Sequence, residues 1–184
     1  MSKRIALLSA AAFSLLAFSA TMSAPASAEE KTVMVGGAAM FPSKNIVQNA
    51  VNSKDHTTLV AAVKAAGLVD TLESKGPFTV FAPTNAAFGK LPAGTVDTLV
   101  KPESKATLTK ILTYHVVAGK LEASDLTDGK KLKTVEGEEL TVKKSGSSVM
   151  IVDAKGGSST VTIPNVNQSN GVIHVVDTVL MPAT

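Results

Sequence analysis

The chain of 184 residues contains no cysteine, no tryptophan and one tyrosine. The absence of cysteine excludes disulfides, thiol chemistry and thiolate-bound metals, so packing alone must hold the fold together. With so few aromatic side chains, the chain has little that could stack on nucleic-acid bases. Its single arginine, Arg4, leaves almost no capacity for bidentate phosphate contacts. We therefore expect no nucleic-acid partner, despite the basic isoelectric point.

The N-terminus has the three parts of a secretory signal peptide. Lys3 and Arg4 precede an apolar run from Ile5 to about Ala20, and Ala-Ser-Ala follows at 26–28. We predict a signal peptide over residues 1–28 and an exported protein, periplasmic or extracellular. A membrane anchor is the weaker alternative, because the apolar run is short and contains serines. With no cysteine near the cleavage site, a lipidated N-terminus is excluded.

Cleavage after residue 28 shortens the chain from 184 to 156 residues and removes two of its 18 basic side chains. The remaining 16 basic residues face 15 acidic ones, a net charge of +1. A domain of about 150 residues buries roughly 70% of its unfolded surface, which is enough for one core without cross-links. We predict a single domain over residues 43–182, preceded by a linker over residues 29–42.

The first half of this domain has the apolar spacing of helices. One helix begins near residue 45. Asp55 is predicted as the N-cap of the next, with His56 exposed in its first turn and Gly67 as its stop. Pro102 suits a first helical position. Further short helices are expected around residues 68–72, 86–88, 95–101 and 102–112.

Strands dominate the rest of the domain. Phe78–Ala82 is β-branched and aromatic, and Pro83 ends it because proline lacks the N–H that a central strand needs. Thr84 or Asn85 then caps a short helix. Later strands are expected at residues 114–119, 132–135, 139–143, 149–152, 160–163 and 172–180, with hairpin turns such as Asn170-Gly171 between them. Helices first and strands later predict an α+β fold, built around an antiparallel sheet or a small sandwich.

The sequence contains no recognisable catalytic constellation. Its three histidines are far apart, and no motif typical of metal ligation, a nucleophile elbow or a phosphate cradle is present. We predict no catalytic, cofactor or metal site, and therefore no enzyme. His115 and His174 lie in apolar surroundings and are expected in the core with their ring nitrogens satisfied. A contact role is the alternative for each of them.

An apolar stretch precedes the first helix. Met34, Met40 and Phe41 lie around Gly36-Gly37, which argues against a regular element there. Because methionine adapts to irregular apolar surfaces, the simplest interpretation is a tail docked on the core of the domain. The alternative is that these side chains line a groove for an apolar ligand.

Three segments together resemble the signature segments of the fasciclin-like domain family. They are FTVFAPTNAAFGKLP from Phe78, TYHVVAGK from Thr113 and NGVIHVVDTVLMP from Asn170. Their order and separation are similar to one complete domain, matched from Ser43 to Pro182, and the overall plan resembles small secreted bacterial members. The resemblance implies a wedge-shaped β-sandwich with helices packed over it. It also implies that the signature residues determine the fold; these are Phe78, Pro83, Thr84, Asn85, Phe88, His174 and Asp177.

The resemblance implies an activity as well, namely adhesion through extracellular protein or carbohydrate contacts. In animal members the Tyr-His segment is linked to receptor contact, which by position implies candidate contacts at Tyr114, His115, Val116 and Val117. Other members bind carotenoid-like pigments. The leading hypothesis is an exported, non-enzymatic adhesion or surface-interaction module that binds a protein or polysaccharide. The alternative is a carrier for an apolar molecule such as a carotenoid or lipid, with Met34, Met40 and Phe41 as its ligand-binding tail.

Overall fold

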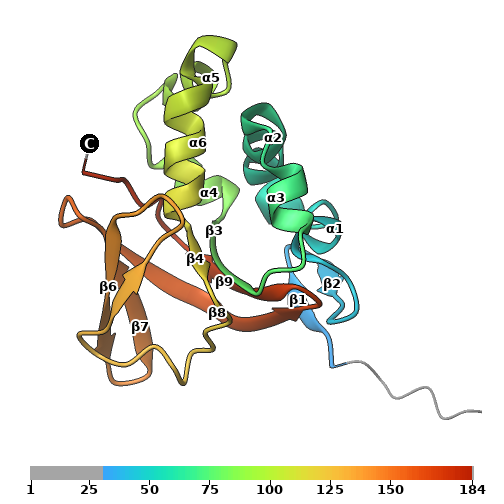
Figure 1. Cartoon of the computed structure of the whole chain (residues 1–184), viewed down its shortest axis with the longest axis vertical. Coiled ribbons are helices and arrows are strands. Elements are labelled where there is room, and N and C mark those ends of the chain that lie inside the picture. The colour runs from blue at the N-terminus through green and yellow to red at the C-terminus, as the bar shows by residue number, and fades with distance from the viewer. Residues whose placement is uncertain (1–30, 184) are drawn as a thin grey trace, which may run out of the picture.

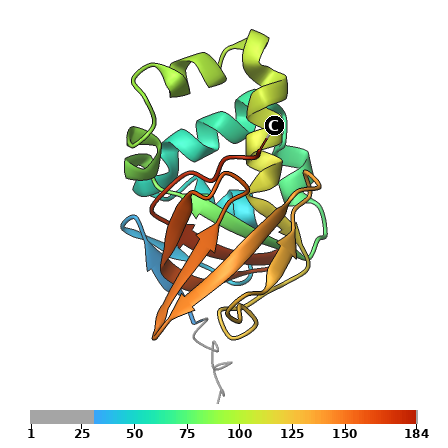
Figure 2. The same cartoon turned by 90° about the vertical axis from the view of Figure 1, so that its left-hand side faces the viewer.

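The computed structural model describes residues 31–183, so the predicted signal peptide lies outside the described residues. The helices gather at one end of the molecule and the strands at the other, as two perpendicular views agree (Figures 1 and 2). Within the described range, every helix is too short or too polar to span a membrane.

Seven strands form one sheet in the order β4-β3-β9-β8-β7-β6-β5. They are β3 (Phe78–Pro83), β4 (Val116–Ala118), β5 (Lys131–Lys133), β6 (Glu139–Ser145), β7 (Ser148–Val152), β8 (Ser158–Gln168) and β9 (Gly171–Val176). All neighbours are antiparallel except β3 and β9, which are parallel. The expectation of an antiparallel sheet is therefore wrong for this pair. A parallel pairing is possible because a long stretch of chain separates the two strands.

The sheet folds back on itself, so that its first and last strands meet. Val117 in β4 forms a bridge with Thr134, and the Val135 N–H donates to the Val116 carbonyl at 2.7 Å. This closure gives two facing layers of strands, in agreement with the predicted β-sandwich. A core fills the space between them, and its largest members are Phe81, Tyr114, Leu126, Leu140, Ile151 and Leu180.

The helices cover β3 and β9 and bury a second core against them. They are α1 (Ile46–Ala50), η1 (Lys54–His56), α2 (Thr57–Ala66), α3 (Val69–Glu73), α4 (Asn85–Gly89), α5 (Thr95–Leu99), η2 (Pro102–Ser104) and α6 (Lys105–Tyr114). Two predictions are confirmed here. Gly67 ends α2 in the left-handed conformation at φ +72°, and Pro102 is the first residue of η2. The apolar stripe of α2, Leu59, Ala62, Val63 and Ala66, is buried in this core.

Residues 33–40 form a β-hairpin, so the prediction of an irregular linker is wrong for this part. Strand β1 (Val33–Val35) pairs with β2 (Ala38–Met40). Gly36 and Gly37 form the two-residue turn, with φ of +57° and +76°. Paired glycines with positive φ are typical of a tight hairpin, and they do not interrupt the element here. Val35 and Met40 are 2% and 3% exposed, so one face of the hairpin belongs to the core.

The turn before β9 ties the helical end to the sheet. The Asn170 side chain accepts a hydrogen bond from the Ile46 N–H at 3.1 Å, at the start of α1. It also donates to the carbonyls of Leu72 at 2.6 Å and Ser74 at 2.9 Å, at the end of α3. The sequence indicated only a hairpin turn at this position. The buried amide thus satisfies groups that two helix ends would otherwise leave unpaired.

Candidate functional site

His115 lies at the junction between α6 and β4, and it is buried as predicted. Its Nδ1 donates to the Ile111 carbonyl at 2.8 Å, and its Nε2 accepts from the Leu180 N–H at 2.9 Å. Because a carbonyl can only accept and an N–H can only donate, the ring is neutral with its proton on Nδ1. Burial lowers the pKa of His115 to about 4, and the nearby Ile111 carbonyl and Asp153 only partly oppose this effect. This histidine joins helix, strand and C-terminal segment.

Tyr114, the only tyrosine, lies in the core between the two strand layers. Its hydroxyl accepts from the Ala154 N–H at 2.9 Å and lies 3.4 Å from the Glu139 carbonyl. Burial raises the pKa of Tyr114. The predicted contact residues Tyr114, His115, Val116 and Val117 are between 0% and 6% exposed. The four side chains therefore offer no exposed surface to a partner.

His174 lies in the middle of β9 and is fully buried, as predicted. Its Nε2 donates to the Leu121 carbonyl at 2.7 Å, and its Nδ1 accepts from the Asn165 N–H at 3.3 Å. The ring stacks on Phe81, with 5.7 Å between centroids. Burial lowers the pKa of His174. Both of its nitrogens are committed to the fold, which leaves neither free for chemistry.

His56 was predicted to be exposed, and this prediction is wrong because the side chain is only 3% exposed. A turn of 3₁₀ helix, η1, precedes α2 and rotates the ring inward. Its Nδ1 lies 2.9 Å from the Ser53 Oγ, while its Nε2 has no hydrogen-bond partner among the described residues. Burial lowers the pKa of His56, and the Ala82 backbone, which lies near the ring outside hydrogen-bond geometry, and the Asp55 charge oppose this effect only in part.

The start of α2 is capped from a distant part of the chain. Asp55 was predicted as its N-cap, but no side chain of the preceding residues makes this hydrogen bond. Instead Asn85 accepts from the Thr58 N–H at 3.0 Å and donates to the Lys54 carbonyl at 2.8 Å. Thr84 is the cap of α4, since its hydroxyl accepts from the N–H of the third following residue at 3.2 Å. The adjacent signature residues Thr84 and Asn85 thus cap two different helices.

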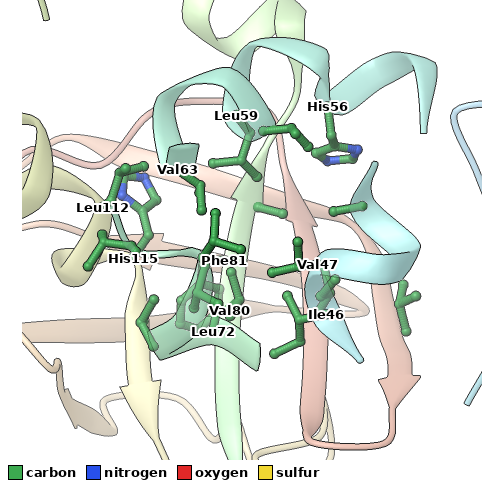
Figure 3. A pocket seen from close by; sticks show the side chains of 18 of the residues that line it. Ile46, Val47, His56, Leu59, Val63, Leu72, Val80, Phe81, Leu112 and His115 are labelled. Carbon is green, nitrogen blue, oxygen red and sulfur yellow. The ribbon is translucent and has the colours of Figure 1, made fainter. Parts of the chain in front are cut away.

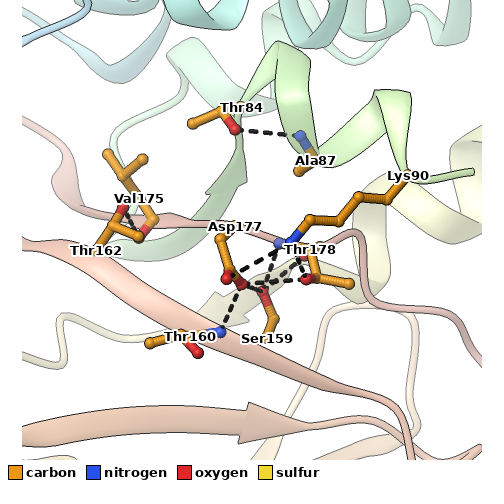
Figure 4. A network of polar contacts seen from close by, with 9 residues as sticks. All are labelled: Thr84, Ala87, Lys90, Ser159, Thr160, Thr162, Val175, Asp177 and Thr178. Atoms are coloured by element: carbon orange, nitrogen blue, oxygen red, sulfur yellow. Dashed lines mark hydrogen bonds and ion pairs between the residues drawn. The ribbon is translucent and has the colours of Figure 1, made fainter.

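Asp177 joins β8 to the chain that follows β9 (Figure 4). Its Oδ1 accepts from the Thr160 N–H at 2.8 Å and from the Thr178 hydroxyl at 3.1 Å. Lys90 approaches the other carboxylate oxygen at 3.6 Å. The pKa of Asp177 is lowered, because these hydrogen bonds and the lysine together outweigh a partial burial that would raise it. The Ser159 hydroxyl in the same network donates to the Thr178 carbonyl at 2.7 Å and accepts from the Thr178 N–H at 3.0 Å, so the network links β8 to the segment after β9 and agrees with a role for Asp177 in the fold.

A narrow apolar cavity of about 50 Å³ lies between the helices and β3. Figure 3 shows side chains from α1, α2, α3, β3 and α6 around it, including Ile46, Leu59, Leu72, Phe81 and Leu112. Pockets for organic ligands usually measure about 300 Å³ or more. The cavity therefore lacks the space for a carotenoid or a lipid chain.

The three residues predicted as an apolar-ligand tail do not line one groove. Met40 is buried and contributes to the cavity wall, as the docked-tail interpretation predicted. Met34 points away from it, because it pairs with Ala39 on the opposite face of the hairpin, and it is 60% exposed. Phe41 is 36% exposed. Two of the three therefore face solvent.

Among the described residues, no group of three or more histidine, aspartate or glutamate side chains is arranged to hold a metal ion. The signature residues singled out in the sequence are instead distributed over the fold. Phe88 is 6% exposed in the helix-side core, Pro83 ends β3 beside β9, and Phe78 begins β3 opposite Gly171.

Comparisons with known proteins identify the family to which this fold belongs. The family model described as the fasciclin domain matches residues 54–182. The protein sll1483 of Synechocystis is 48% identical over 153 residues, which cover 83% of this chain and 82% of its own. The immunogenic protein MPB70 of Mycobacterium bovis is 41% identical over 138 residues, covering 72% of this chain and 66% of its own.

The cell surface glycolipoprotein MPB83 of Mycobacterium bovis is 40% identical over 153 residues, covering 80% of this chain and 64% of its own. This chain thus spans about two thirds of the length of the two mycobacterial relatives. Among solved structures, a FAS1 domain pair from the insect cell adhesion molecule fasciclin I matches with a TM-score of 0.68 at 19% identity, over 77% of this chain and 52% of that chain. The likeness to that pair shows the fold, and the family model and the relatives together show that this chain belongs to the fasciclin domain family.

Proposed function

We propose that this protein is an exported, non-enzymatic surface-interaction module that binds an extracellular protein or polysaccharide. The observation that carries the proposal is a whole fasciclin domain whose most distinctive polar side chains are all engaged in the fold. Relatives point the same way, since one is named a cell surface glycolipoprotein and a solved structure of the same fold comes from a cell adhesion molecule. The leader sequence supports export.

The state of the histidines supports a non-enzymatic role. A general base must reach the proton that it abstracts, and it works best with a pKa near the operating pH. His115 and His174 lie in the interior with both nitrogens hydrogen-bonded, and burial lowers the pKa of each. Neither ring faces a cavity of substrate size. The proposal therefore assigns binding to the outer surface of the domain.

In this proposal the segment from Tyr114 to Val117 affects binding only indirectly, by supporting the surface next to it. The next residue, Ala118, is exposed, and it follows directly from the buried strand β4. A substitution at Tyr114 or His115 would disturb the surface around Ala118 by loosening the core beneath it. Loss of binding in such a variant with unchanged thermal stability would instead make that residue a direct contact.

The proposal is tested with protein isolated from the medium and periplasm of its own host. We expect the exported protein to bind one class of polysaccharide or surface protein on an array, and to lose this binding after heat unfolding. Turnover in a broad esterase or glycosidase screen that disappears in His115→Ala would contradict the non-enzymatic assignment. An apolar molecule retained in the native mass spectrum would favour the carrier alternative.

A further inference from the structure

The hairpin end of the domain has a surface composition unlike the rest of the chain. Five large apolar side chains are exposed among the described residues, and three of them, Met34, Phe41 and Val51, lie between Lys31 and Lys54. The same stretch contains three lysines and no acidic residue, and the exposed Asp55 directly follows it. Exposed apolar groups concentrated in one place and bordered by charge mark an interaction surface more often than scattered ones do.

The geometry of the hairpin holds these apolar groups outward. Met34 and Ala39 form one outward pair, and the two paired positions on either side of them face inward. The backbone of Phe41 is fixed by Asn49, whose side chain accepts from its N–H at 3.0 Å and donates to its carbonyl at 2.8 Å. These bonds involve only the backbone of Phe41, and its side chain is 36% exposed.

The lysines lie around the same surface. The Lys44 ammonium group is 4.9 Å from the centroid of the Phe41 ring. The Lys54 N–H donates to the Gly36 carbonyl at 3.2 Å, which places Lys54 at the hairpin tip, and Lys31 lies two residues before the start of β1. An apolar surface bordered by lysines is complementary to a layer with anionic headgroups above an apolar interior.

We propose that this hairpin end docks reversibly on an anionic lipid surface. Met34 and Phe41 enter the boundary between headgroups and acyl chains, and Lys31, Lys44 and Lys54 contact the headgroups. The inference goes beyond the proposed function, because it concerns a different surface and holds whichever extracellular partner the domain binds.

Two other occupants of this surface are less compatible with its chemistry. A second copy of the chain would bring two sets of three lysines together, and like charges in an interface are unfavourable. Protein interfaces are enriched in arginine, methionine and aromatic residues and depleted in lysine. The stretch between Lys31 and Lys54 supplies methionine and phenylalanine, but it has three lysines and no arginine, tyrosine or tryptophan. A lipid layer requires only apolar side chains and mobile positive charges.

The test is co-sedimentation of the exported protein with vesicles. We expect binding to vesicles of phosphatidylcholine mixed with phosphatidylglycerol, little binding to phosphatidylcholine alone, and weaker binding as salt is raised. Met34→Ser should weaken binding about tenfold, which corresponds to the apolar area that leaves water. Lys44→Gln should weaken it about fivefold. Since all variants share one N-terminus, any contribution of residues before Lys31 cancels in the comparison.

Val100→Ser is the control for Met34→Ser, because Val100 is also an exposed apolar residue, at 36%, and lies just after α5 at the other end of the molecule. We expect this variant to bind as the unmodified protein does. Equal binding to both kinds of vesicle, or equal binding of Met34→Ser and the unmodified protein, would overturn the proposal. So would self-association in the absence of lipid that Met34→Ser abolishes, since that result would assign the surface to a second copy.

Discussion

The buried state of His115 predicts that the protein loses stability in mild acid. Its pKa is about 4 in the folded chain, against about 6.5 when the chain is unfolded. Since the folded-state pKa is the lower one, protons bind the unfolded chain more readily as pH falls below 6.5. The free energy of unfolding therefore decreases between pH 6.5 and pH 4, and it becomes independent of this group below pH 4.

The size of this effect follows from the difference between the two pKa values. A difference of about 2.5 units corresponds to a loss of about 3 kcal/mol, which is complete only below pH 4, where the folded chain is protonated as well as the unfolded one. Between pH 7.5 and pH 5 the loss from His115 alone is about 2 kcal/mol. His56 and His174 also have lowered pKa values, so they add to the loss in the same direction.

Urea unfolding at pH 7.5 and at pH 5 measures the loss directly. Circular dichroism follows the helices, and the fluorescence of Tyr114 follows the core, with no tryptophan to mask it. The comparison variant is His115→Gln, which is less stable at both pH values but lacks the titrating ring. We expect its stability to fall by about 2 kcal/mol less than that of the unmodified protein over this interval. An identical fall in both proteins would refute the assignment of His115 as a neutral buried group.

Three further predictions concern residues that organise the fold, and thermal or urea unfolding checks each of them. Asn170→Ala removes three hydrogen bonds at two helix ends, two of them buried, and should cost at least about 3 kcal/mol; a loss below about 1 kcal/mol would contradict its linking role. Gly171→Ala places a Cβ in steric conflict with the Phe78 carbonyl oxygen, so we expect severe destabilisation, and near-normal stability would show that β3 and β9 are less tightly apposed. Asn85→Ala should cost about 1 to 2 kcal/mol through the uncapped Thr58 N–H; an unchanged melting temperature would remove Asn85 from this role.

Much of the fold could be predicted from local sequence. The strand at Phe78, the stop at Gly67 and the helix start at Pro102 each depend on a residue with a strong conformational preference of its own. The hairpin at 33–40 differs from the sequence-based expectation because its strands have only three residues each, and paired glycines also occur in irregular segments. Short strands carry too few positions for alternation to be recognised.

The missed features of the site depend on contacts between distant segments. Asn85 caps a helix that begins 28 residues before it, so no spacing rule within one helix could identify the pair. Asn170 reads as an ordinary turn residue, although its side chain contacts two helix ends that lie about 100 residues or more away in sequence. His56 reads as exposed because its burial depends on the preceding 3₁₀ turn and the elements packed around it. Such positions are set by tertiary packing, which a single sequence does not display.

The contact residues predicted from the family resemblance illustrate a related difficulty. A sequence motif can be distinctive because it determines the fold, because it contacts a partner, or for both reasons. The amino-acid sequence alone does not distinguish these roles. Here Tyr114 and His115 are buried and hydrogen-bonded to the backbone of other segments. The sequence therefore predicted that these two positions are important, whereas only the structure shows that their side chains point into the core.

The central claim is that this domain acts outside the cell by binding a surface. The most direct test compares attachment of host cells to natural surfaces with and without the gene, and then adds back the exported protein. We predict that deletion reduces attachment, and that the exported protein restores it while the heat-unfolded protein does not. Unchanged attachment of the deletion strain on every natural surface tried would contradict the account.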